Sequence, residues 1–209
     1  MENFPDTKWR IVTIHQDIYD PDWITSDTDG MILRTQLTPV FDKYDIDVVL
    51  QGHDHTYSRS KILYGDGKTH GSYEFRLDET GLDYDWDHAY NKNTGDSITL
   101  NPLSSDTAAV EAKDAFTADN KCYTIESSGK SVVTNPKGTL YMTANSASGS
   151  KYYELINSQQ DYIEVRSQNW LPSYSVIDLT KDDFKITTYQ ITDEGKVENI
   201  DIPLPFTRP

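Results

Sequence analysis

The chain has 209 residues, of which 34 are acidic and 19 are basic, so its formal net charge at pH 7 is −15. A field of this sign repels nucleic acid and anionic membranes, which argues against both as partners. The only cysteine, Cys122, excludes an internal disulfide, and no run of about 18 apolar residues is present to span a membrane. An apolar content of 36% with 14 tyrosines still indicates a globular chain rather than a disordered one.

The first fifty residues show the pattern of a strand, a helix and a second strand. Residues 10–14 and 46–50 are short β-type apolar runs, and residues 31–44 carry apolar side chains three and four positions apart. Pro39 leaves two interpretations of the helical segment. Either the helix kinks there, or Thr38 caps a short helix whose first residue is Pro39.

Histidines follow both predicted strands. His15 comes directly after the first strand, and Gly52 with His53 and His55 follows the second. If the strands are parallel neighbours, the three imidazoles gather at their carboxyl ends, where open α/β sheets bind ligands. Imidazole is a common metal ligand, so the pattern predicts a metal site made by His15, His53 and His55. The alternative for a lone His15 is an ordinary histidine at the end of a strand.

Residues 8–15 and 52–60 together resemble the calcineurin-like metallophosphoesterases, and the purple acid phosphatases more than the nucleases. The second segment is similar to the family's Gly-His-x-His signature. The resemblance implies that His15 and His53 ligate one metal of a dinuclear centre and that His55 ligates the other. It also implies two metal ions (Fe, Zn or Mn) and the hydrolysis of a small phosphate ester by a metal-bound hydroxide.

Arg59, just after the signature, is a candidate phosphate contact because its planar guanidinium matches phosphate geometry. The alternative is an exposed arginine at the start of the next strand.

The family's other motifs, an Asp-x-His, a Gly-Asp and a Gly-Asn-His, are absent from this sequence. We therefore expect a C-terminal portion of a metallophosphoesterase, inactive by itself, whose missing N-terminal half supplies the remaining ligands and any export signal. At most one metal ion is expected in this chain, completed by water or by Asp17. A half-domain exposes the face that its other half normally covers. We therefore expect the partner at this face to be the missing N-terminal half or, in a dimer, a second copy of this chain. The resemblance also predicts a secreted or cell-envelope protein of a bacterium.

The rest of the chain divides into a polar middle and a β-rich end. We predict residues 1–63 as half of the metallophosphoesterase core, 64–137 as a polar insertion with a short helix over 107–116, and 138–209 as the β-rich completion of the same domain. Predicted strands cover 139–144, 162–166, 174–179 and 184–191, with a hairpin turn at 193–196. The predicted fold class is α/β (α+β), as a two-sheet sandwich flanked by helices.

Two further alternatives concern the middle of the chain and its aromatic residues. Asp83, Asp85 and Asp87 alternate as in a calcium loop, but the spacing favours a solvated loop. If Trp86, Trp170 and Tyr152 form one flat platform, the chain is instead a non-catalytic module that binds carbohydrate or protein.

Overall fold

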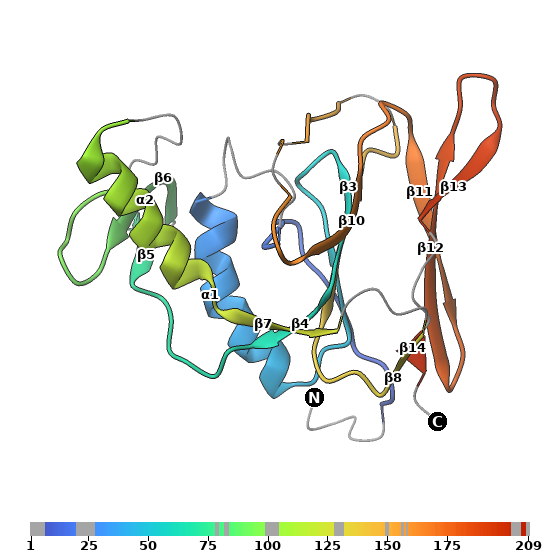
Figure 1. Cartoon of the computed structure of the whole chain (residues 1–209), viewed down its shortest axis with the longest axis horizontal. Helices are drawn as coiled ribbons and strands as arrows, with labels where there is room; N and C mark the ends of the chain where they lie inside the picture. The colour runs from blue at the N-terminus through green and yellow to red at the C-terminus, as the bar shows by residue number, and fades with distance from the viewer. Residues whose placement is uncertain are drawn as a thin grey trace.

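The structure is a computed structural model that describes residues 7–19, 28–77, 80–81, 84–98, 105–127, 132–148, 151–155, 157, 159–201 and 206–207. Within these residues two five-stranded sheets pack face to face, and two helices lie beside the first sheet, on the side away from the second (Figure 1). The predicted α+β sandwich with a β-rich C-terminal third is therefore confirmed. No helix among the described residues has the length and apolar character needed to cross a membrane.

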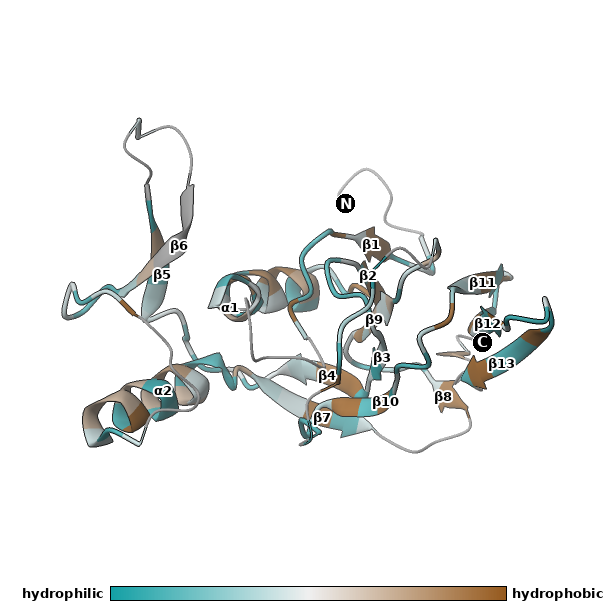
Figure 2. Cartoon of the chain, turned by 90° about the horizontal axis from the view of Figure 1, so that it is seen from above, coloured by the Kyte–Doolittle hydropathy of each residue, from teal (hydrophilic) through white to brown (hydrophobic). Residues whose placement is uncertain are grey.

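The first sheet contains the predicted strand, helix, strand unit. Its strand order is β1 (Ile11–Thr13), β2 (Val48–Gln51), β9 (Leu140–Ala144), β3 (Tyr57–Ser60) and β10 (Ile163–Ser167). Strands β1, β2 and β9 are parallel, whereas β3 and β10 are antiparallel to their neighbours. Figure 2 shows these five strands in succession from above. The predicted parallel pairing of the first two strands is thus confirmed.

Helix α1 (Thr28–Lys43) connects β1 to β2 and contains Pro39 in its interior. The prediction of a short helix beginning at Pro39 is therefore wrong. A proline inside a helix removes one backbone donor, which usually costs stability. Here Phe41, close to the proline, is buried in the core on the first sheet, and this tertiary packing holds the turn in helical form.

The second sheet is built mainly from the last third of the chain. Its order is β11 (Ser173–Leu179), β12 (Asp183–Ile191), β14 (Phe206–Thr207) and β8 (Val133–Thr134), and β13 (Val197–Asp201) also pairs with β12. The predicted hairpin between β12 and β13 is present. Gly195 takes a φ of 75° in its turn, and the N–H of Thr192 donates to the carbonyl of Lys196 at 2.9 Å.

Alternate residues of the central strands face opposite sides of the first sheet and form two layers of the core. Val48 on β2 and Leu140 and Met142 on β9 point into the space between the sheets, where they meet Phe184 of β12. The residues between them in sequence point the other way. Val49 and Tyr141 pack with Phe41 of α1 and with the chain after His15. Each central strand is therefore buried on both faces, which explains its nearly continuous apolar sequence.

The predicted polar insertion contains regular structure. Strand β4 (Ile62–Gly65) pairs with β7 (Tyr123–Ser127), and β5 (Tyr73–Leu77) forms a hairpin with β6 (Tyr84–Asn91). Helix α2 (Thr107–Asn120) extends four residues beyond its predicted end and starts at Asp106, whose carboxylate accepts from the N–H of Ala109 at 3.1 Å. Asp83 and the side chains of Asp85 and Asp87 lie outside the described residues, so the calcium loop stays a prediction, as do the domain boundaries.

Candidate metal site

The parallel pairing of β1 and β2 brings their carboxyl ends together. The N–H of Ile14 donates to the carbonyl of Leu50 at 3.0 Å, and the N–H of Gly52 donates to the carbonyl of His15 at 3.1 Å. A Cβ at position 52 would lie 3.3 Å from that same carbonyl oxygen. Glycine at this position therefore allows the two chains to approach closely.

The tight turn after β2 places its positive φ on His53, not on Gly52. His53 has a φ of 65°, a left-handed conformation that is uncommon for residues with a Cβ. Such a conformation persists only where the surrounding structure imposes it, and it is found at binding and active sites more often than elsewhere. Gly52 thus provides the close approach of the two chains, whereas His53 adopts the left-handed conformation.

The structure brings His15 and His53 together. Their ring centroids lie 5.4 Å apart, with an angle of 87° between the ring planes. Two imidazoles on one tetrahedral zinc ion, each with a Zn–N distance of ~2.0–2.1 Å, have ring centroids about 5 Å apart. The His15 side chain is exposed and that of His53 is half-buried, so an ion reaches the pair from solvent. The spacing suits two ligands of one ion.

His55 is held by a different part of the chain. Its Nδ1 lies 2.8 Å from the carbonyl oxygen of Lys151, and its ring packs against Tyr153 with centroids 5.1 Å apart. Because a carbonyl oxygen can only accept a hydrogen bond, Nδ1 is the donor, and in the neutral form of the ring Nε2 is the nitrogen with the lone pair. A metal-ligating histidine commonly makes this bond with its other nitrogen. His55 is thus in the tautomer that a ligand requires.

A complete dinuclear centre does not fit the part of the chain that the structure describes. No group of three or more histidine, cysteine, aspartate or glutamate side chains lies close enough there to hold a metal ion. Asp17, the carboxylate expected to complete the site, is 3% exposed and accepts from the N–H of Tyr19 at 3.1 Å and from the side chains of Gln51 and Thr143. Both of its oxygens are therefore already engaged, so Asp17 is not free to complete the site in this structure.

Gln51 and Thr143 are residues of this region that the sequence analysis missed. They occupy neighbouring positions on β2 and β9, and both are buried. Gln51 also accepts from the N–H of Ile18 at 3.0 Å. Together they fix the segment that follows His15. The available signal was a polar residue at or near the end of each apolar run, where parallel strands place ligand-binding or supporting side chains.

Arg59, the candidate phosphate contact, lies on β3 and is buried. Its Nε donates to Oδ2 of Asp201 at 2.6 Å, and its Nη2 donates to Oδ1 at 3.2 Å. The alternative of an exposed arginine is therefore wrong. The phosphate contact stays a prediction, and the ion pair with Asp201 already occupies one edge of the guanidinium.

The aromatic platform predicted for a binding module is not flat where the structure describes it. The rings of Tyr152 and Trp170 meet at 77°, with centroids 6.0 Å apart. The third member, Trp86, has its side chain outside the described residues. An edge-to-face pair presents no common plane for a sugar ring to stack on, so this observation does not favour the binding-module alternative.

Comparison with known proteins gives distant structural similarity only. No family model matches the chain, and no curated protein matches it. The chain is similar to purple acid phosphatase from yellow lupin (Lupinus luteus) seeds, with a TM-score of 0.45 and 11% identity over 96% of this chain and 25% of that one. It is also similar to Vps29 from Chaetomium thermophilum, with a TM-score of 0.25 and 12% identity over 96% of this chain and 100% of that one.

The chain thus spans about a quarter of the length of the lupin phosphatase. These similarities are too weak to carry an argument about function or family. The family therefore stays a prediction that depends on the sequence motifs and on the geometry of the histidines.

Proposed function

We propose that this chain is the C-terminal portion of a calcineurin-like metallophosphoesterase that hydrolyses a small phosphate ester, and that it is inactive by itself. The observation that carries the proposal is the pair of imidazoles, His15 and His53, at the carboxyl ends of two parallel neighbouring strands. Their 5.4 Å separation suits a shared ion, and the left-handed conformation of His53 indicates that the fold imposes this arrangement.

A metal ion bound at this site would activate water and polarise a phosphoryl oxygen. In this proposal His15 and His53 hold one ion, and His55 offers its Nε2 to the second. The segment that carries the absent Asp-x-His, Gly-Asp and Gly-Asn-His motifs supplies the other ligands. The complete protein then holds two ions of Fe, Zn or Mn, whereas this chain holds at most one.

The first sheet offers a place for the missing half. Among the described residues, β1 pairs only with β2, so its other edge is open, and Ile11 on β1 is 38% exposed. An open strand edge presents backbone donors and acceptors to another strand. A strand of the missing half, or of a second copy of this chain, would complete the sheet there.

Charge supports a small ester as the substrate. A net charge of −15 repels a polyanion such as nucleic acid, whereas a single phosphate group at a metal site meets a local positive field. The predicted bacterial secreted or envelope location stays a prediction.

The proposal is tested by metal binding and turnover measured on the same preparations. Metal-free chain is titrated with Zn²⁺ by calorimetry and with Co²⁺ by visible absorption, and its hydrolysis of p-nitrophenyl phosphate is followed. We expect at most one ion per chain and no turnover. His15→Ala and His53→Ala should each weaken binding more than about tenfold, since even residues outside the ligand shell contribute on this scale.

His70→Gln serves as the matched control. His70 lies outside the site and bonds to Asp66 at 2.9 Å, so its replacement should leave the titration unchanged. Binding of an ion that is equally tight in the wild-type chain and in all of the variants would overturn the metal role. Two ions per chain with turnover that is lost in His53→Ala would show instead that the chain is a complete enzyme.

A further inference from the structure

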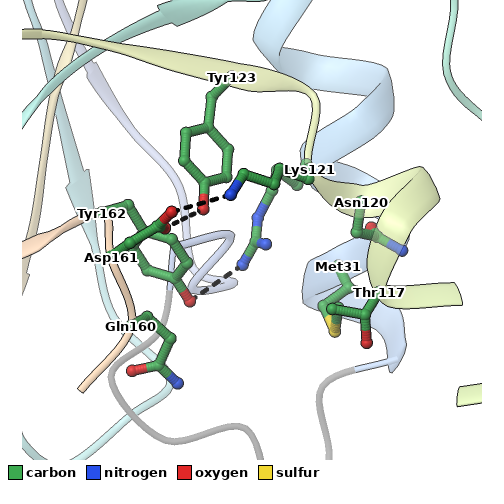
Figure 3. A pocket seen from close by; sticks show the side chains of 9 residues that line it. Met31, Thr117, Asn120, Lys121, Tyr123, Gln160, Asp161 and Tyr162 are labelled. Carbon is green, nitrogen blue, oxygen red and sulfur yellow. Dashed lines mark hydrogen bonds and ion pairs between the residues drawn. The ribbon is translucent and has the colours of Figure 1, made fainter. Parts of the chain in front are cut away.

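A cavity of about 370 Å³ lies between the two helices and the first sheet, and the proposed phosphoesterase function does not use it. Its walls come from α1, the C-terminal end of α2, the start of β7 and residues 160–162 before β10 (Figure 3). Small-molecule sites in proteins typically have volumes of about 300–1,000 Å³ and combine apolar walls with a few polar groups. This cavity is of that size and kind.

The cavity contains a buried arginine without an acidic partner among the described residues. Arg34 of α1 is 5% exposed, and its guanidinium carbon lies 4.6 Å from the ring centroid of Tyr19 and 5.0 Å from that of Tyr162. Its Nε donates to the carbonyl of Ile18, and its Nη2 donates to the hydroxyl of Tyr162 at 3.4 Å. None of the described ion pairs includes Arg34. A buried charge without a counter-ion is costly, and aromatic faces offset only part of that cost.

Asp161 lines the same cavity, but it is occupied by other partners. Its carboxylate binds the ammonium of Lys121 at 3.0 Å and accepts from the hydroxyl of Tyr123 (Figure 3). The acidic and basic groups at this edge of the cavity thus neutralise each other. The positive charge of Arg34 is the one left uncompensated within the described part of the cavity.

Two amide side chains beside the cavity have buried polar atoms without a described hydrogen-bond partner. The amide nitrogen and oxygen of Gln160 are both buried and make no hydrogen bond with any described residue. Asn120 is 1% exposed, and its Nδ2 donates to the carbonyl of Phe116 at 2.8 Å while its Oδ1 has no described partner. Because these atoms are closed off from solvent, they lie behind the cavity surface and do not themselves contact a molecule in it.

We propose that this cavity binds a small organic monocarboxylate. The carboxylate pairs with the free N–H groups of Arg34, and the apolar or aromatic body of the ligand packs against Met31 and Tyr162. A singly charged ligand suits the site better than a phosphate dianion, because a single arginine is left uncompensated there. The proposal is independent of the metal site.

Ligand binding tests the proposal on the full chain. Benzoate is titrated by calorimetry, with the neutral isostere benzamide and inorganic phosphate as comparisons. We expect benzoate to bind at least about tenfold more tightly than benzamide and phosphate, and to raise the thermal unfolding midpoint, as a ligand specific to the native state does. The double variant His15→Ala/His53→Ala should bind benzoate normally, which separates this site from the metal site.

Arg34→Met should abolish benzoate binding, with Arg76→Met as its control. Arg76 is also an arginine over a tyrosine ring, 4.6 Å from the centroid of Tyr90, but it lies outside the cavity. Thr117→Trp tests the cavity without replacing a buried residue. Thr117 is exposed on α2 at the cavity, so a large side chain there fills the space, whereas Ala118→Trp at the next exposed position leaves it open.

The proposal predicts that Thr117→Trp loses benzoate binding and that Ala118→Trp retains it, whether or not Arg34→Met folds. Equal affinity for benzoate and benzamide, equal binding by the two tryptophan variants, or an absence of benzoate binding would each overturn it. Tighter binding of phosphate than of benzoate would overturn the assignment of the ligand class.

Discussion

Arg59 on β3 and Asp201 on β13 form a buried ion pair that joins the two sheets of the sandwich. The side chains are each 6% exposed, and two guanidinium nitrogens contact the two carboxylate oxygens at 2.6 and 3.2 Å. The hydroxyl of Tyr57 donates to the same carboxylate at 2.5 Å. One carboxylate near the C-terminus thus fixes the strand that immediately follows the histidine signature.

We expect Asp201→Ala to destabilise the chain by about 3–5 kcal/mol, because it leaves the guanidinium of Arg59 buried without its partner. Urea unfolding followed by circular dichroism measures the change. Asp182→Ala is the control, since the pair between Lys8 and Asp182 is partly exposed, at 34% and 55%, and its loss should change stability little. Equal losses in the two variants would contradict a structural role for the buried pair.

Position 138 should not tolerate a side chain. Gly138 has a φ of 125°, and a Cβ there would lie 2.5 Å from the backbone oxygen of Leu63. That oxygen accepts from the N–H of Thr139 at 2.7 Å, which joins β4 to β9. We therefore expect Gly138→Ala to cost stability both through backbone strain and through displacement of this bond.

Gly67→Ala separates these two causes. Gly67 has a φ of 75° but open space around it, so its replacement should cost only the strain of a left-handed residue, about 1–2 kcal/mol. We expect Gly138→Ala to cost about 1–3 kcal/mol more than Gly67→Ala, the usual range for overpacking. Urea unfolding of the two variants gives the difference, and equal costs would show that β4 and β9 move apart freely at this point.

The local parts of the fold were predictable from the sequence because their signals are periodic. Short apolar runs identified β1 and β2, alternating apolar residues identified β9, β11 and β12, each within one or two residues, and the spacing in α1 identified a helix. Pro39 left two interpretations of that helix open, since the packing of Phe41 that keeps the turn helical involves residues far away in sequence. Tertiary contacts override propensity in such cases.

The candidate metal site was predictable in part. Two histidines at the ends of two parallel strands follow from the strand pattern alone, and the structure places them together. The pairing of Arg59 with Asp201 spans 142 residues and has no local signal. Arg34 was missed for the same reason, because only the folded chain shows that no described carboxylate pairs with it.

The ionised carboxylate of Asp66 should stabilise the folded chain, and this contribution should be lost at acidic pH. Burial by itself raises the pKa of Asp66, but the backbone N–H of Lys68 and the ring of His70 outweigh it and hold the pKa below its usual value. A carboxyl whose folded pKa is lowered contributes stability that is fully present above the unfolded pKa of about 3.9 and is lost as pH falls through the folded pKa. Asp66→Asn should therefore be less stable than wild type at pH 7.

Urea midpoints at pH 7 and at pH 3 measure this contribution. The difference between wild type and Asp66→Asn should be smaller at pH 3, where protonation begins to remove the carboxylate from the wild-type chain as well. A difference that is the same at both pH values would show that the hydrogen-bond geometry, and not the charge, stabilises this turn.

Asp42 should show the opposite pH dependence. Burial raises the pKa of Asp42, and the hydrogen bond from the N–H of Gly65 at 2.8 Å and the charge of Lys137 offset this only in part. Its Oδ1 is buried without a described hydrogen-bond partner. The carboxylate also lies in the last turn of α1, where the helix dipole disfavours negative charge by about 0.3–1 kcal/mol. Ionised Asp42 thus destabilises the folded chain.

We therefore expect Asp42→Asn to be more stable than wild type at pH 7, since the amide oxygen still accepts from Gly65 and the charge is gone. The penalty in wild type is absent below the unfolded pKa of about 3.9 and fully present above the raised folded pKa, so the advantage of the variant should grow as pH rises through that window. Urea midpoints at pH 3, 5 and 7 follow it. Asp66→Asn should change stability in the opposite direction over the same pH range. A general effect of net charge would instead change the stability of both variants in the same direction, so the comparison of the two variants distinguishes it from these local effects.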